Sequence, residues 1–322
     1  MNHNQPGDAP MTIPILIDTD PGVDDAMALL LALASPELDV LGVTTVFGNS
    51  DDIRLMTANA LAILALAGRD DIPVAAGSAH PLTRPYAGRA HLVHGDNCLG
   101  GVKLPASPRQ AEPTFAAQFI VDACRARPGE VTLVAVGPLT NLALALRIEP
   151  ALPKLVRGVA IMGGSARASG NITPAAEFNI FADAEAARLV FGAGWEIIMA
   201  GLDVTCSPRI AEEYLDRLAA AGNRAGRFLA DAFVHYLAFY RSRGFTGACM
   251  HDVHAVMALV RPELYTAERV CIDVETAGEL TRGQTVADFR GLWNRPAQTR
   301  LLTGVDETIF LDEFATRIAR LP

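Results

Sequence analysis

Four aspartates stand close together near the start of the chain, in the string Asp-Thr-Asp-Pro-Gly-Val-Asp-Asp that covers residues 18–25. They are Asp18, Asp20, Asp24 and Asp25. Any one of them alone would be read as the end of a strand or as a helix cap, because aspartate is favoured at both places. Together they repel one another strongly once they are partly removed from water. We therefore predict that this string binds a divalent cation.

The elements on either side of the string predict where the aspartates lie. The apolar run 13–17 is too short for a helix and is typical of a buried parallel strand, and strong helix formers follow from Ala26. Pro21 and Gly22 favour a sharp turn between the two elements. Open α/β sheets bind ligands at the carboxyl ends of their strands, which is where this turn falls.

The rest of the chain repeats this alternation of strand and helix. Further strands are expected at 39–46, 72–76, 131–136, 158–162, 195–200 and 270–274, and helices at 55–67, 115–127, 137–147, 184–191, 210–221, 224–242, 252–260 and 306–319. Regular alternation of this kind predicts an α/β fold: a single domain at 13–322 with a mainly parallel open sheet flanked by helices, a Rossmann-like core. Residues 1–12 are expected to form a loose tail, 77–113 a long loop, and the helix-rich part 209–261 one rim of a pocket.

Small or polar residues follow several of the predicted strands. Asn49, Gly77, Gly137 and Gly163 are examples, and the carbonyl of Val136 comes directly before Gly137. Since parallel strands end at one edge of the sheet, these residues should gather beside the acidic string. This predicts the polar floor of a pocket.

Composition narrows the class of partner. The 322-residue chain is 50% hydrophobic and carries a net charge of −9, without a lysine or arginine cluster, which argues against nucleic acid or an anionic membrane as partner. The 5 cysteines are scattered, so neither a disulfide framework nor a thiolate zinc site is indicated. No apolar run resembles a signal peptide or a membrane span, and a cytoplasmic protein with a small neutral ligand is expected.

The acidic string resembles the signature of the inosine-uridine-preferring nucleoside hydrolases, which cleave the N-glycosidic bond of ribonucleosides. The segments 170–179 and 250–255 resemble the ribose-binding and late metal-binding segments of the same family, and the likeness runs from about Ile13 to Phe314. The resemblance implies the nucleoside hydrolase fold and a ribonucleoside hydrolase that releases a free base and ribose. It also implies a homo-oligomer, a dimer or a tetramer, with a role in nucleoside salvage and in purine and pyrimidine catabolism.

The resemblance further implies a calcium ion. Its ligands would be Asp20, Asp25, Asp252 and the main-chain carbonyl of Val136, with Asp18 behind them. Oxygen-only ligation suits calcium, and the sequence leaves magnesium open. The spacing of His251 and His254 around Asp252 would also suit zinc, but the other candidate ligands are all oxygen.

Roles in substrate binding and catalysis come from the same likeness. Ribose would be held by Asp24, Asn49, Met162, Asn171, Glu177 and Asn179, and the base side would be formed by His94, Phe178, Tyr236 and Tyr240. Asp20 would take a proton from a metal-held water of lowered pKa, and His251 would donate to the departing base because imidazole titrates near neutrality. Each residue also has a plainer interpretation: a turn for segment 170–179, and helix packing for the two tyrosines.

Other functions and the preferred base stay open at this stage. A nucleoside phosphorylase would need an anion site, which the carboxylates oppose. An aspartate-nucleophile phosphatase would need a lysine with a threonine or serine partner downstream, and no matching pair follows a strand. A non-catalytic nucleoside-binding or sugar-binding protein is the rival outside enzymes. The segment containing His251 resembles inosine-uridine or pyrimidine-preferring members, whereas purine-specific ones stack the base between tryptophans, and Trp195 and Trp293 lie outside the base-side segments. Relatives commonly carry glycine where this chain has Cys98, which leaves the flexibility of that loop open.

Overall fold

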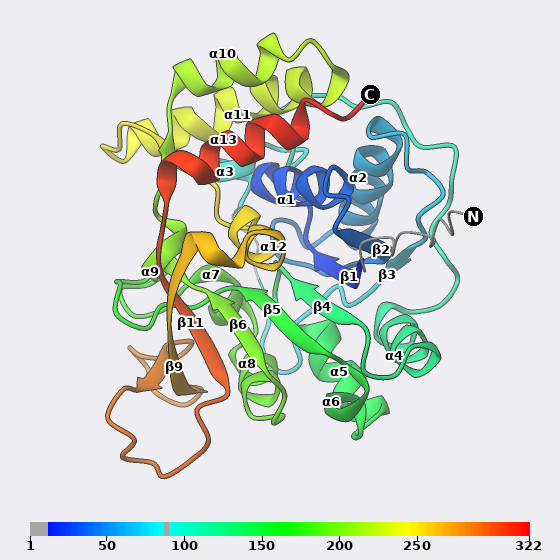
Figure 1. The fold of residues 1–322 in the computed structure, drawn as a ribbon. Helices are drawn as coiled ribbons and strands as arrows, with labels where there is room; N and C mark the ends of the chain where they lie inside the picture. The colour runs from blue at the N-terminus through cyan, green and yellow to red at the C-terminus, as the bar shows by residue number, and fades with distance from the viewer. Residues whose placement is uncertain (1–11, 87–89) are drawn as a thin grey trace, which may run out of the picture.

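A nine-stranded sheet runs through the molecule, in the order β10-β9-β11-β6-β5-β4-β1-β2-β3 (Figure 1). The computed structural model describes residues 12–86 and 90–322, so the predicted tail lies outside the described residues except for Thr12. The strands are β1 (Ile13–Thr19), β2 (Leu38–Thr45), β3 (Val74–Ala76), β4 (Thr132–Ala135), β5 (Gly158–Met162), β6 (Ile197–Ala200), β9 (Tyr265–Val274), β10 (Thr285–Asp288) and β11 (Thr299–Val305). Within this sheet, neighbours pair in parallel from β11 to β3, and β9 pairs antiparallel with β11 and β10. The predicted mainly parallel α/β sheet is confirmed.

Helices cover both faces of this sheet (Figure 1). On one face lie α1 (Val23–Leu33), α2 (Ile53–Leu66), α10 (Glu212–Ala220), α11 (Arg224–Ser242), α12 (Val253–Val260) and α13 (Glu307–Ile318). On the other lie α4 (Ala116–Ala126), α5 (Thr140–Ile148), α6 (Leu152–Leu155) and α8 (Ala184–Phe191). The remaining described helices are short: α3 (His91–His94), α7 (Phe178–Ala182), α9 (Leu202–Thr205) and a 3-10 turn (Pro262–Leu264).

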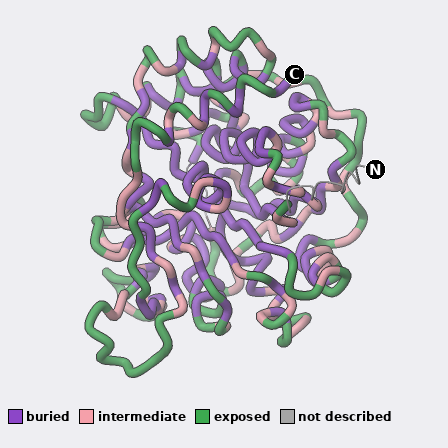
Figure 2. The backbone as a smooth tube through the Cα atoms, in the orientation of Figure 1, coloured by how far each residue is buried: buried purple, intermediate pink, exposed green. Residues whose placement is uncertain are grey.

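The central strand β1 shows why its sequence is apolar at consecutive positions. Ile15 and Ile17 belong to the core on the α1 side, and Leu16 belongs to the core on the α4 side. A parallel strand that is covered on both faces needs apolar side chains at every position rather than at alternate ones. Figure 2 shows this burial running through the strands and α1, while the outer helices alternate between buried and exposed residues. The acidic string is therefore attached to a strand and a helix that are largely buried.

Three local predictions were wrong. The strand predicted at 270–274 begins at Tyr265, and the following segment, read as a loop region, contains β10 and β11. The helix predicted from Ile210 begins at Glu212, because Arg209–Ile210 form a strand, β7, paired with β8 (Ala248–Cys249). The long loop at 77–113 contains α3. The strands β7, β8, β10 and β11 form by pairing with segments distant in sequence or across a loop, and local sequence patterns do not reveal such partners.

No helix among residues 12–86 and 90–322 combines the length and the apolar character needed to cross a membrane.

Candidate active site

The acidic string forms the turn between β1 and α1 as expected. Gly22 is the N-cap of α1, and its backbone N–H donates to Oδ2 of Asp25 at 2.9 Å. The Thr19 hydroxyl donates to Oδ1 of the same carboxylate at 2.5 Å. Asp25 therefore does cap the helix, in the N3 position where an acid reaches back to the N-cap, and the positive end of the helix dipole favours its charge.

Two asparagines, Asn49 and Asn141, donate hydrogen bonds to carboxylates of the acidic string. The backbone N–H of Asn49 donates to Oδ2 of Asp20 at 2.7 Å, and its side-chain amide donates to Oδ2 of Asp25 at 3.1 Å. Asp18 lies behind the turn, where Asn141 and Thr44 donate to its Oδ1 at 2.8 and 2.6 Å. Sequence reasoning missed Asn141, because nothing near residue 141 indicates a partner 123 positions away.

Asp252 joins the cluster from the other half of the chain. It is the N-cap residue of α12 but makes no side-chain cap hydrogen bond. Instead, its carboxylate lies with those of Asp24 and Asp25, and one oxygen of each of the three falls within 4.8 Å of the others. The plain capping role that a lone aspartate would have at this position is therefore absent. Two other predicted metal ligands lie outside this triad. Asp20 is not among its three carboxylates, and the Val136 carbonyl accepts a hydrogen bond from the side-chain amide of Asn179 at 2.8 Å.

The electrostatics of the cluster favour a cation. Burial and the neighbouring Asp24 charge raise the pKa of Asp25 to about 6, and burial raises the pKa of Asp24 to about 6. Burial, with repulsion from Asp25 and Asp24 respectively, holds the pKa values of Asp20 and Asp252 well above their ordinary range. Among the described residues, the ion pairs contain no lysine or arginine bound to these four carboxylates, and Asp24 has only His94, at 3.9 Å. Buried carboxylates without a cationic side chain are a set of hard oxygen donors that fits a calcium or magnesium ion.

A cavity of about 790 Å³ opens above this cluster. The residues predicted to bind the metal, the ribose or the base all line it: Asp20, Asp24, Asp25, Asn49, His94, Val136, Met162, Asn171, Glu177, Phe178, Asn179, Tyr236, Tyr240, His251 and Asp252. Gly77, Gly137 and Gly163, predicted for the pocket floor, are not among the lining residues. A cavity of this size accommodates a small-molecule ligand such as a nucleoside. Neither tryptophan lines it, since Trp195 is buried in the core and Trp293 lies in the segment after β10.

One wall of the cavity is built from amides and a carboxylate. Glu177 is the N-cap of α7 and accepts from the backbone N–H groups of Asn179 at 2.9 Å and Ile180 at 3.1 Å. The N–H of Gly164, just past β5, donates to the same carboxylate at 2.9 Å. Asn171 accepts from Phe178 N at 2.9 Å, so it fixes the loop to the start of α7. Burial raises the pKa of Glu177 to about 7.

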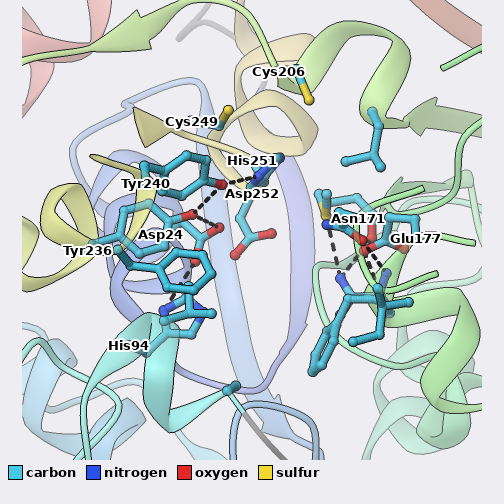
Figure 3. A pocket seen from close by; sticks show the side chains of 18 of the residues that line it. Asp24, His94, Asn171, Glu177, Cys206, Tyr236, Tyr240, Cys249, His251 and Asp252 are labelled. Atoms are coloured by element: carbon cyan, nitrogen blue, oxygen red, sulfur yellow. Dashed lines mark hydrogen bonds and ion pairs between the residues drawn. The ribbon is translucent and has the colours of Figure 1, made fainter. Parts of the chain in front are cut away.

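The opposite wall is built from imidazoles and hydroxyls (Figure 3). The Tyr240 hydroxyl lies 2.7 Å from Nε2 of His251, and the Thr205 hydroxyl lies 2.8 Å from its Nδ1. The Tyr236 hydroxyl donates to Oδ2 of Asp24 at 3.2 Å. The His94 ring stacks on the Tyr236 ring, with 5.3 Å between the ring centroids. The predicted alternative of simple helix packing for the two tyrosines is therefore insufficient, because both hydroxyls take part in the polar lining. Thr205 was not predicted, since only the fold brings α9 beside His251.

The two histidines differ from the sequence-based expectation in one respect. Burial lowers the pKa of His251 to about 3 and that of His94 to about 4. We expected imidazole to titrate near neutrality, but an imidazole deprived of water disfavours its charged form. Near neutral pH these rings are neutral, each with one N–H to donate. The backbone N–H of Val23 donates to Nδ1 of His94 at 3.1 Å, which leaves Nε2 of that ring as the protonated nitrogen.

Cys98 occupies a position whose backbone suits glycine. Its φ is 61°, in the left-handed region that residues with a Cβ seldom adopt. The side chain is buried, and its Sγ lies 3.5 Å from the carbonyl of Asn49. The cysteine thus contacts Asn49, whose amides bind Asp20 and Asp25.

Comparison with known proteins agrees with this arrangement. The family profile described as "Inosine-uridine preferring nucleoside hydrolase" matches residues 15–312. The pyrimidine-specific ribonucleoside hydrolase RihA of Citrobacter koseri is 41% identical over 311 residues, which cover 96% of this chain and 99% of that protein. Two solved structures superpose with a TM-score of 0.91 at 34% identity: a plant nucleoside hydrolase, covering 97% of this chain and 100% of that one, and the purine-preferring ribonucleoside hydrolase of Gardnerella vaginalis, covering 95% and 98%.

A parallel α/β sheet with a buried acidic cluster at its carboxyl edge, in the company of these relatives, defines a hydrolase of N-glycosyl compounds. The predicted enzyme class is thereby confirmed. The chain belongs to the inosine-uridine-preferring nucleoside hydrolase family.

Proposed function

We propose that this protein is a calcium-dependent ribonucleoside hydrolase with an inosine-uridine or pyrimidine preference, which releases a free base and ribose. The observation that carries the proposal is the triad of Asp24, Asp25 and Asp252, three buried carboxylates with oxygens within 4.8 Å of one another on a cavity of about 790 Å³. Asp20, Asp25, Asp252 and the carbonyl of Val136 would hold the ion, as the family resemblance implies, and Asp24 lies beside them. When bound, calcium supplies an electrophilic centre that lowers the pKa of water and fixes ribose hydroxyls.

The wall around Glu177 would bind the sugar. A ribose hydroxyl both donates and accepts, so the carboxylate of Glu177 and the amides of Asn171, Asn179 and Asn49 suit it. Met162 would contribute apolar contact. Cleavage passes through a positively charged, oxocarbenium-like sugar, which the carboxylates along the floor stabilise without reorganising.

Asp20 is the proposed general base. Its Oδ2 accepts from Asn49 N, and it lines the cavity beside the triad. A carboxylate whose pKa is raised by burial binds a proton more readily than one in water, so Asp20 is well suited to take the proton of the attacking water.

The base would leave along the wall that contains His251 and Tyr240. A heterocycle departs more easily when it gains a proton or a strong hydrogen bond. The hydroxyl of Tyr240, hydrogen-bonded to His251, and the N–H of His94 are donors that line this wall. Phe178 and Tyr236 would add aromatic surface against the base.

The relatives bear differently on base preference. RihA of Citrobacter koseri is named as pyrimidine-specific, and the Gardnerella vaginalis enzyme as purine-preferring. We propose the inosine-uridine or pyrimidine preference because, of the described residues, those lining the cavity include no tryptophan to stack a purine. We also retain as proposals the homo-oligomer, the cytoplasmic location and the role in nucleoside salvage.

The test is product formation from uridine, cytidine, inosine and adenosine in phosphate-free buffer. Base and ribose should appear in equal amounts, activity should vanish with a chelator, and added calcium should restore it. A requirement for phosphate would instead identify a phosphorylase, and intact nucleoside after prolonged incubation would identify a binding protein.

A further inference from the structure

An arginine with no acidic partner stands at the mouth of the acidic cavity. Arg209 lines the cavity and is exposed, and its guanidinium carbon lies 4.1 Å from the centre of the Phe245 ring. Arg217 pairs with Asp312 at 2.6 Å and Arg241 with Glu212 at 3.1 Å. Arg243 also lines the cavity, and its guanidinium carbon lies 5.3 Å from the centre of the Phe239 ring. Among the described residues, Arg209 is in no salt bridge and donates no side-chain hydrogen bond. Its guanidinium is held in place by stacking while its N–H donors stay free.

The backbone of Arg209 is fixed relative to the wall that would receive the base. Strand β7 pairs antiparallel with β8, and Arg209 lies opposite Cys249 in that register. His251 follows two residues after Cys249. In Figure 3, Cys249, His251 and Tyr240 lie together on this side of the cavity. Strand pairing therefore holds the backbone of Arg209 beside the base-side wall, and its guanidinium stacks on Phe245 at 4.1 Å. Arg243, by contrast, is the C-cap of α11 and lies over Phe239 at the longer distance of 5.3 Å.

The charge of Arg209 reaches into the cavity. After a hydrogen bond with Cys249, it contributes to lowering the pKa of Cys206, which also lines the cavity, to about 7. A positive charge that perturbs this thiol is close enough to act on a ligand in the same cavity.

The orientation of a bound nucleoside decides what this arginine would meet. With the ribose on the carboxylate floor, the glycosidic nitrogen lies deep, and the opposite edge of the base points to the mouth. That edge carries an oxygen in uracil, at C4, and in hypoxanthine, at C6, but an amino group in cytosine and adenine. A guanidinium has only donors, so it pairs with the oxygen and leaves the amino group unpaired.

We propose that Arg209 is a specificity-determining residue that donates to the exocyclic oxygen at C4 of a pyrimidine or C6 of a purine. It thereby favours oxo bases over their amino counterparts, uridine over cytidine and inosine over adenosine. The inference rests on the proposed function, since it requires that a nucleoside occupies the cavity.

The test compares kcat/KM for the four nucleosides in the wild type and in Arg209→Met, which keeps the apolar stem but removes every donor. The ratios of uridine to cytidine and of inosine to adenosine should fall roughly tenfold, the usual scale for a lost hydrogen bond to a charged group. Arg209→Lys, which keeps the charge but loses the planar fork, should fall between the two. Arg217→Met is the matched control, because Arg217 also lies over an aromatic ring, Tyr214 at 5.9 Å, but does not line the cavity.

Unchanged ratios in Arg209→Met would overturn the inference, as would an equal loss for all four substrates or the same change in Arg217→Met. Failure of the proposed function looks different, because the wild type would then leave all four nucleosides intact. If Arg209→Met does not fold, as judged by its thermal transition, the ratios in Arg209→Lys decide the question.

Discussion

The hydroxyl of Tyr240 lies 2.7 Å from Nε2 of His251, and Thr205 lies 2.8 Å from Nδ1 of the same ring. Both nitrogens of the imidazole are thus engaged by hydroxyls. The ring is held in one orientation. When its Nε2–H donates to the Tyr240 oxygen, the Tyr240 hydroxyl is the donor that reaches the cavity.

Tyr240→Phe should therefore slow the departure of poor leaving groups. We expect kcat for uridine to fall by roughly 10- to 100-fold, within the range of positioned acid catalysis. A nitrophenyl riboside, whose leaving group departs without a proton, should lose less than about threefold, because only the departure step depends on this donor. Tyr214→Phe is the control, since that hydroxyl donates to the Leu311 carbonyl away from the cavity. Equal losses with both substrates would contradict the assignment.

Metal removal should abolish turnover. Asp25→Asn deletes one charge from the triad, and we expect its calcium affinity, measured by titration calorimetry, to fall by at least roughly tenfold, because calcium affinity depends on the number of charged ligands. The chelated wild type should be inactive and should recover with calcium. Asp122→Asn, on the exposed face of α4, should behave like the wild type. Full activity of the wild type after chelation would refute the metal site.

The same cluster should destabilise the metal-free protein. Asp252→Asn removes one of several buried like charges, so at pH 8 its metal-free form should melt at a higher temperature than the metal-free wild type. Calcium at 100 times its Kd should add about 2.7 kcal/mol to the unfolding free energy of the wild type. The melting temperature of the wild type should rise accordingly. The variant should show little of that increase. A lower melting temperature for the metal-free variant would mean that the carboxylates do not repel one another in the folded protein.

A salt bridge far from the cavity should make stability depend on pH. Glu37 pairs with the buried Arg317 through two hydrogen bonds, at 2.7 and 2.8 Å, and the Arg317 bond lowers the pKa of Glu37 below its ordinary value of 4.5. A lowered folded-state pKa gives stability that is present above the unfolded pKa and is lost as pH falls through the folded one. Glu37→Gln should cost about 1 kcal/mol at pH 7, because Glu37 is partly exposed and Glu313 still pairs with Arg317.

Denaturant titrations of the wild type and Glu37→Gln at several pH values would check this. The difference between them should shrink below about pH 4.5 as Glu37 takes up its proton. Glu130→Gln, at an exposed contact of 4.0 Å with Arg127, is a suitable control and should change little at any pH. A difference that persists unchanged in acid would show that the loss comes from packing rather than from the charge.

Much of the fold followed from local patterns. The parallel α/β sheet was predicted from the apolar run 13–17, the turn at Pro21 and Gly22, and the later strand and helix ranges. This was possible because a strand that is buried on both faces has apolar residues at consecutive positions. The strands β10 and β11 escaped detection, since β10 has only four residues and both depend on pairing with β9. Local propensity carries no information about such partners.

For the site, the sequence by itself determined the kinds of chemical groups: the acidic string at 18–25, the amide-rich segment at 170–179 and the histidine segment at 250–255, whose resemblance to one family supplied their expected roles. Only the tertiary structure decided which of these groups lie close together. Asp252 meets Asp24 and Asp25 across more than two hundred residues, Thr205 and Tyr240 enclose His251, and Arg209 lies at the mouth through the pairing of β7 with β8. Residue type is a local property of the chain, but the distance between two side chains depends on how the whole sheet and its helices pack.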